Sequence, residues 1–227
     1  MNSKYNTFLT ILLVIIIIAI IVIIGFLGYK FISNANSKKE AEDFVDSWNE
    51  DISKDNTKDN PTTSDTQIDV DVTTPTESTK TESTESKDQK YNGFLISGSI
   101  EIPKTNLKSP IIAQSEYSKT SLETAVCEVY STGDGINKPG NTTIAGHNYR
   151  NSTFFSNNKK LSIGDKIYIT GLDGKKMTYT IYDKYETEDT DSDYMTRDTQ
   201  GAVEISLTTC TDNNNQKRLI ILAKADV

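Results

Sequence analysis

The sequence is poor in the residues on which several common kinds of functional site depend. Of its 227 residues, one is histidine, two are cysteine and one is tryptophan. A single histidine excludes a metal site built from several histidines, and two cysteines exclude a disulfide-rich scaffold. Acidic side chains outnumber basic ones by 32 to 24. This balance excludes a broad basic surface, so we expect no nucleic-acid partner.

The first part of the chain lacks charge almost completely. Phe8 to Leu27 is a run of 20 uncharged residues dominated by isoleucine. At about 1.5 Å per residue, such a helix reaches about 30 Å, the thickness of a bilayer's hydrocarbon core. We therefore predict a transmembrane anchor over residues 1–33. The alternative is a cleaved signal peptide, whose apolar region would be shorter. The flanking lysines do not decide the orientation of the anchor.

Residues 34–90 contain 7 basic and 15 acidic side chains and form the most acidic part of the chain. Ser37-Lys38-Lys39-Glu40 matches a capping box, and Ala41, Phe44, Val45 and Trp48 follow at helical spacing. This pattern predicts a short juxtamembrane helix. From residue 53 to residue 90 there is no aromatic residue, and 15 of the 38 residues are Ser or Thr. We predict a disordered linker there, since so little apolar surface cannot offset the chain entropy.

Residues 91–227 alternate short apolar runs with turn residues, which favours a mainly β domain. One helix is expected, with Ser118 as its N-cap and Leu122, Ala125 and Val126 on its apolar side. A second short helical turn is expected to hold Phe154, Phe155 and Leu161. Seven or eight short strands in about 135 residues indicate a closed or nearly closed barrel. The expected strands are 98–102, 110–113, 142–145, 166–170, 176–184, 203–208 and 219–224.

Three residues with suitable chemistry lie at the ends of predicted strands. His147 follows one apolar strand, Cys210 ends another, and Arg218 begins the next. A thiolate is a nucleophile for acyl transfer, a histidine can act as its acid or base, and a guanidinium can offset an oxyanion. Each residue alone could equally be structural or solvated. Cys127 lies inside an apolar run and is expected in the core.

The motifs that contain these residues resemble those of sortases. The resemblance lies in Thr-Thr-Ile-Ala-Gly-His-Asn at 142–148, Leu-Thr-Thr-Cys at 207–210 and Lys-Arg-Leu-Ile-Ile-Leu-Ala at 217–223. It also includes Gly98–Pro103 and covers most of residues 94–226. It implies a closed eight-stranded sortase-type β-barrel with short helices, placed outside the cell on a single-pass membrane anchor. The corresponding domains are 1–33, 34–90 and 91–227.

The resemblance also implies an activity. Sortases of Gram-positive bacteria cleave an LPxTG-like C-terminal sorting signal of a surface protein and join the new carboxyl end to an amine of a cell-wall peptidoglycan precursor. By matching position, Cys210 would be the nucleophile, His147 the acid and base, and Arg218 the oxyanion and substrate ligand. Thr209 would line the substrate groove, and the backbone N–H of Thr211 would be a second oxyanion donor.

The segment 185–201 has no room for the long helical insertion of class B sortases, and no Asp-Pro-aromatic lid motif is present. The resemblance is therefore to class A-like or class D-like enzymes. No cofactor is expected. Calcium activation through Glu128, Asp134 and the acidic segment is an alternative to a merely solvated loop. The competing functions are a membrane-anchored binding module or inactive sortase-like domain, and another kind of cysteine transpeptidase or peptidase.

Overall fold

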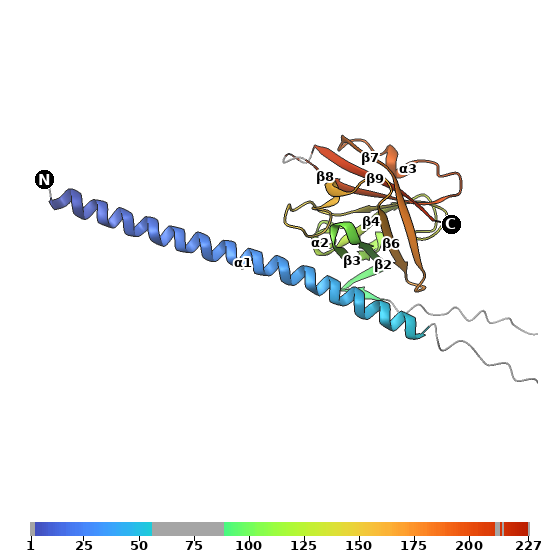
Figure 1. The fold of residues 1–227 in the computed structure, drawn as a ribbon, viewed down its shortest axis with the longest axis horizontal. Coiled ribbons are helices and arrows are strands. Elements are labelled where there is room, and N and C mark those ends of the chain that lie inside the picture. The colour runs from blue at the N-terminus through green and yellow to red at the C-terminus, as the bar shows by residue number, and fades with distance from the viewer. Residues whose placement is uncertain (1–2, 56–88, 212–213, 215, 227) are drawn as a thin grey trace, which may run out of the picture. The chain divides into compact units, whose positions relative to one another are not determined.

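The computed structural model describes residues 3–55, 89–211, 214 and 216–226. They divide into two compact units, Met1–Asp43 and Phe44–Val227. The predicted disordered linker lies almost wholly outside the described residues. Figure 1 shows the ribbon, with the α-helices and most of the strands labelled.

Helix α1 (Ser3–Asp55) begins close to the N-terminus and continues through the region expected to contain two separate elements. The capping box predicted at Ser37 is therefore wrong, because the helix does not begin there. No proline interrupts residues 3–55, so nothing in the sequence forces a break. Phe8–Tyr29 has a mean hydropathy of 3.6 and is unburied, which fits a membrane anchor.

The rest of the described chain forms a closed barrel of eight strands, as predicted. The strands pair in the order β2-β3-β4-β5-β8-β9-β7-β6, and pairing of β2 with β6 closes the ring. A two-residue strand, β1 (Lys90–Tyr91), pairs with β2 at its margin. The barrel strands are β2 (Phe94–Ile102), β3 (Leu107–Ile112), β4 (Val126–Ser131), β5 (Gly140–Ala145), β6 (Lys166–Gly171), β7 (Lys176–Glu188), β8 (Val203–Cys210) and β9 (Lys217–Ala225).

Short helical segments join these strands. They are η1 (Pro103–Thr105), η2 (Gln114–Glu116), α2 (Lys119–Thr124), η3 (Asn158–Lys160) and α3 (Asp193–Thr196). Ser118 caps α2 as predicted, accepting a hydrogen bond from the Ser121 backbone N–H at 3.1 Å. The helix ends at Thr124, however, and Val126 begins β4. Assigning Val126 to the helix was wrong because the extended pairing of β4 with β3 and β5 takes over there.

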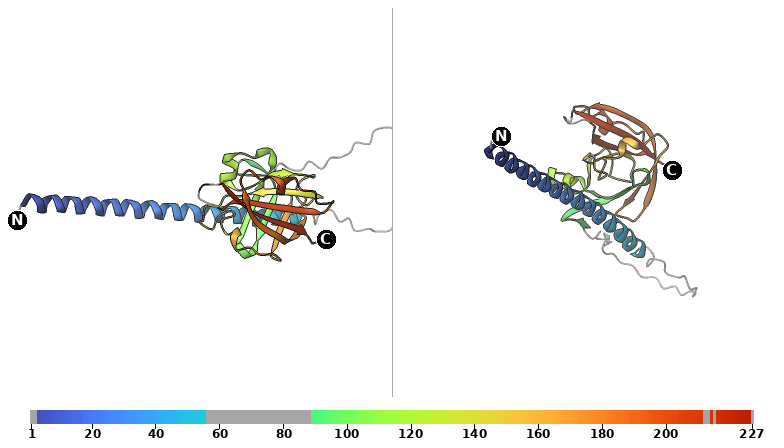
Figure 2. Two further views of the ribbon diagram at one scale, coloured as in Figure 1. Left: turned by 90° about the horizontal axis from the view of Figure 1, so that it is seen from above. Right: turned by 60° about the vertical axis from the view of Figure 1, so that its left-hand side comes forward.

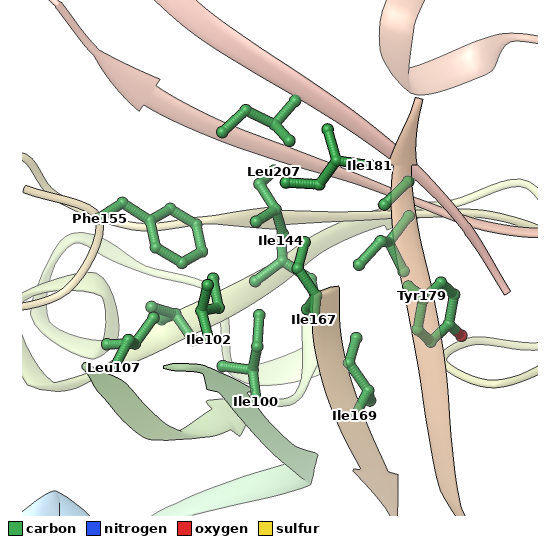
Figure 3. Close-up of a cluster of buried hydrophobic side chains, with 14 of the residues drawn as sticks. Ile100, Ile102, Leu107, Ile144, Phe155, Ile167, Ile169, Tyr179, Ile181 and Leu207 are labelled. Atoms are coloured by element: carbon green, nitrogen blue, oxygen red, sulfur yellow. The ribbon is translucent and has the colours of Figure 1, made fainter. Parts of the chain in front are cut away.

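Inward-facing side chains of nearly all strands fill the barrel. Aliphatic residues dominate, and Phe155 and Tyr179 are the large aromatic members, both fully buried. Figure 3 shows how Ile100, Ile144 and Leu207 from three different strands meet in this core. Two strand pairs, β3–β4 and β5–β8, are parallel, and the others are antiparallel. The parallel β5–β8 pair decides where the candidate site forms, since both strands end at the same end of the barrel.

Candidate active site

The strand register brings the three predicted residues together. Cys210 and Arg218 are direct partners in the β8–β9 ladder. In the parallel β5–β8 pair, Ala145 lies beside Thr208, and the Gly146 N–H donates to the Thr208 carbonyl at 3.2 Å. Continuing by two residues brings His147 level with Cys210. Since neighbouring strands lie about 5 Å apart, the backbones of all three residues fall within about 10 Å.

Cys210 and Arg218 also share a face of the sheet. Leu207 and Leu219 point into the barrel core, so Cys210 and Arg218 alternate to the outer face. On that face, Ile220 and Leu222 form a second cluster with Tyr194 of α3. Cys210 and Arg218 are both partly exposed. The thiol therefore lies at the end of this outer face, where Cys210 and Arg218 are partly accessible to solvent.

His147 is held in a partly buried setting at the end of β5. Its ring lies 4.8 Å from that of Tyr149, and its backbone carbonyl accepts a hydrogen bond from the Phe155 N–H at 3.1 Å. Burial lowers the pKa of His147, while the nearby Glu123 carboxylate raises it and Lys119 lowers it. Among the described residues, the buried Nε2 atom has no hydrogen-bond partner. A mainly neutral imidazole with an uncommitted nitrogen suits proton transfer.

Asn148 adds a contact that the sequence did not reveal. Its side-chain Nδ2 donates to the backbone carbonyl of Cys210 at 2.9 Å. The residue directly after His147 thus ties the ends of β5 and β8 together. Its place next to the histidine was the only signal in the sequence.

Thr209 and Thr211 flank the thiol, and both make contacts within the barrel. Thr209 is buried, and its hydroxyl donates to the Gly146 carbonyl at 2.7 Å. The Thr211 N–H donates to the Lys217 carbonyl at 3.1 Å. In this conformation the two residues hold β5, β8 and β9 together. The Thr211 N–H would have to leave its bond before it could donate to an oxyanion.

A buried polar network fixes the β7–β8 connection above this face. Arg197, just after α3, forms an ion pair with Glu204 on β8, and its Nη2 donates to Asn141 Oδ1 at 2.8 Å. Asn141 Nδ2 in turn donates to the Tyr194 carbonyl at 3.0 Å, and the Tyr182 hydroxyl donates to Glu204 at 2.8 Å. Sequence reasoning missed this network. The available signal was one arginine within an acidic segment.

The second cysteine lies in a different environment. Cys127 is fully buried on β4, and burial raises its pKa to about 11, although a hydrogen bond to Ser121 opposes the shift. Neither cysteine is in a disulfide. Cys127 is therefore a core residue, as predicted.

A pocket of about 520 Å³ lies at the opposite end of the barrel. Its lining includes the β4–β5 connection, which precedes β5, and the β6–β7 turn. Glu128, Asp134 and Asp173 line it, but no carboxylate of residues 186–198 does. Within the described ranges, no group of three or more His, Cys, Asp or Glu side chains is arranged to hold a metal ion. The carboxylates expected to cooperate in a calcium site thus do not share this pocket.

Comparison with known proteins agrees with this geometry. A family model described as the sortase domain matches residues 100–226, more than half of the chain. The chain belongs to the sortase family. Sortases are cysteine transpeptidases, and the matched segment contains His147, Cys210 and Arg218. No match was found among curated proteins.

Solved sortase structures of several classes share the fold. A sortase D5 transpeptidase from Clostridium perfringens has a TM-score of 0.55 and 24% identity, over 84% of this chain and 98% of that chain. A lid mutant of sortase A from Corynebacterium diphtheriae has a TM-score of 0.52 and 26% identity, over 58% of this chain and 70% of that one. Sortase C-1 from Actinomyces oris has a TM-score of 0.51 and 22% identity, over 57% and 73%.

Proposed function

We propose that this sortase is an active transpeptidase that cleaves an LPxTG-like sorting signal and transfers the surface protein to a cell-wall amine. The observation that carries the proposal is the strand register. Cys210 and Arg218 are ladder partners, and extending the β5–β8 register by two residues beyond Ala145, where β5 ends, brings His147 level with Cys210. Three residues with side chains suited to acyl transfer are thus near one end of the barrel, which supports the proposal.

The reaction follows from the roles that these groups can take. Cys210 Sγ attacks the scissile carbonyl, and its proton passes through His147 to the nitrogen of the leaving amine. The C–N bond breaks and a thioacyl enzyme remains. An incoming amine attacks the thioacyl carbon and gives its proton to His147, and the C–S bond breaks to return the thiol. The Arg218 guanidinium stabilises the oxyanion that forms in each half of the reaction.

The neighbouring contacts support these roles. The Asn148 and Thr209 hydrogen bonds hold the ends of β5 and β8 together, which limits drift between the histidine and the thiol. The outer-face cluster of Tyr194, Ile220 and Leu222 is almost fully buried and packs α3 on the sheet, and we propose that α3 flanks a substrate groove that ends at the thiol. We propose Thr209 as a support of this groove. We further propose that the barrel faces outside the membrane, where surface proteins and peptidoglycan precursors meet.

The test is covalent capture by the full chain in detergent micelles. A panel of sorting-signal peptides is incubated with the wild-type protein, Cys210→Ala and Cys127→Ala, and the intact masses are measured. We expect a thioacyl adduct and amine-dependent transfer with the wild type and with Cys127→Ala, and neither with Cys210→Ala. Cys127→Ala is the matched control because it removes the other thiol.

Two results would contradict the proposal. One is an adduct that persists in Cys210→Ala. The other is the absence of cleavage of every peptide together with a Cys210 thiol that does not react with an alkylating reagent. Calcium is added in a parallel series, and a rate increase that Asp134→Asn abolishes would support a metal role for the acidic residues.

A further inference from the structure

The helix segment Phe44–Ile52 has one strongly buried face. Val45, Trp48 and Ile52 lie at helical spacing, and their side chains are 0%, 6% and 9% exposed. A helix alone cannot cover its own side chains to this extent, so another element must cover this face. Asp46, at the margin of this face, and Ser47, outside it, are exposed.

Two contacts identify the covering element as the barrel, within the unit that spans Phe44–Val227. The ring of Phe44 lies 4.9 Å from that of Tyr91 on β1. The Lys108 ammonium on β3 lies 2.5 Å from Asp46 Oδ1. Tyr91 is itself only 5% exposed. An apolar centre flanked by an ion pair is the usual composition of a specific contact between protein surfaces.

These contacts bear on whether the acidic Ser/Thr-rich stretch can act as a tether. The chain enters this stretch after Ile52 and leaves it at Lys90, and both residues belong to the same unit. A segment that starts and ends on one body adds nothing to the distance which that body can travel. The stretch was expected to be the tether of the barrel, but its two ends do not separate the barrel from the membrane anchor.

We propose that Phe44–Ile52 is a docked part of the catalytic unit, and that residues 30–43 alone set the reach of the barrel from its anchor. The apolar span ends at Tyr29 and the docked segment begins at Phe44. The intervening 14 residues belong to α1 and span about 21 Å as a helix; even if the helix unwound there, they would reach at most about 50 Å. If residues 53–89 were also a tether, they would add up to about 125 Å. Docking therefore confines the enzyme to acceptors and clients close to its own membrane.

The test uses the only tryptophan of the chain as a reporter. The full chain is placed in lipid nanodiscs, and acrylamide quenching of Trp48 is measured for the wild type, Val45→Asp and Ser47→Asp. Val45→Asp puts a charge on the buried face, and Ser47→Asp puts the same charge on the exposed face of the same turn. We expect quenching to increase several-fold in Val45→Asp, with a red-shifted emission, and to stay unchanged in Ser47→Asp.

A substitution on the barrel checks the partner surface. Tyr91→Ala should also increase Trp48 quenching, although it is far from Trp48 in the sequence. Quenching of the wild type as fast as that of Val45→Asp would overturn the proposal. So would quenching of wild-type Trp48 by brominated lipids, because the bilayer would then be what covers it.

The reach is measured by energy transfer from a donor on Cys210 to an acceptor on lipid headgroups. Deleting residues 60–80 should leave the transfer efficiency unchanged in the wild type and alter it in Val45→Asp. An equal change in both backgrounds would show that the stretch is a tether and would overturn the proposal. None of these measurements reads enzymatic activity, so their outcome is independent of the proposed function.

Discussion

Removal of the Arg197 side chain tests whether the β7–β8 connection is held by a buried ion pair. The side chains of Arg197 and Glu204 are 18% and 9% exposed, so solvent screens the pair weakly. Breaking such a pair by removing one partner costs about 3–5 kcal/mol, because the other charge stays buried. The lower end applies to Arg197→Met, since the Tyr182 hydroxyl still donates to Glu204 and the Ser206 hydroxyl still donates to Asn141.

The double variant tests whether the loss of stability comes from the buried Glu204 charge that is left without its partner. Arg197→Met with Glu204→Met removes both charges, and we expect it to lose less stability than Arg197→Met alone. The free energy of unfolding is measured by urea titration of the full chain in detergent, followed by tyrosine circular dichroism in the near ultraviolet. A loss below about 1 kcal/mol in Arg197→Met would be that of a surface pair and would refute the reasoning. The reasoning would also be refuted if the double variant lost as much unfolding free energy as the two single variants together.

Two further predictions concern buried groups on β4. With a pKa of about 11, Cys127 is a thiolate in about one molecule in a thousand at pH 8, so alkylation of the native chain followed by mass spectrometry should modify Cys210 long before Cys127. Equal rates would mean that β4 opens readily. Burial raises the pKa of Glu128, so the folded state loses stability as the pH rises above the unfolded value of about 4.5. Glu128→Gln should therefore raise the unfolding free energy at pH 7 but not below pH 4.5, and a loss of stability at pH 7 would contradict this.

The barrel could be predicted because its strands carry an apolar alternation that depends only on local sequence. All seven expected strands exist, each somewhat longer than its apolar run. β4 was missed because Ala125 and Val126 also continue the apolar side of α2. Ala125 adopts an extended conformation, with φ −155°, and this ends the helix. Pairing with two neighbouring strands makes this segment a strand, and a short stretch of sequence cannot reveal such pairing.

The sequence could predict which residues form the candidate site, but not how they are arranged in space. His147, Cys210 and Arg218 each mark a strand end, which the sequence reveals. Their proximity depends on the parallel β5–β8 register, which only the closed barrel defines. The Asn148 and Arg197 contacts depend on connections that fold back over the strands, so no periodicity could indicate them.

The separation of β5 from β8 along the chain has a consequence for biosynthesis. His147 and Cys210 are 63 positions apart, and the pairing that aligns them is non-local, of the kind that forms slowly. β9, which carries Arg218, comes after the other seven barrel strands in the sequence, so the barrel cannot close before β9 has been synthesised. Figure 2 shows this final pair of strands, in red, crossing the barrel. The thiol therefore meets its partners only after β9 has been made and the barrel has closed, so a chain that lacks β9 carries no assembled reactive centre.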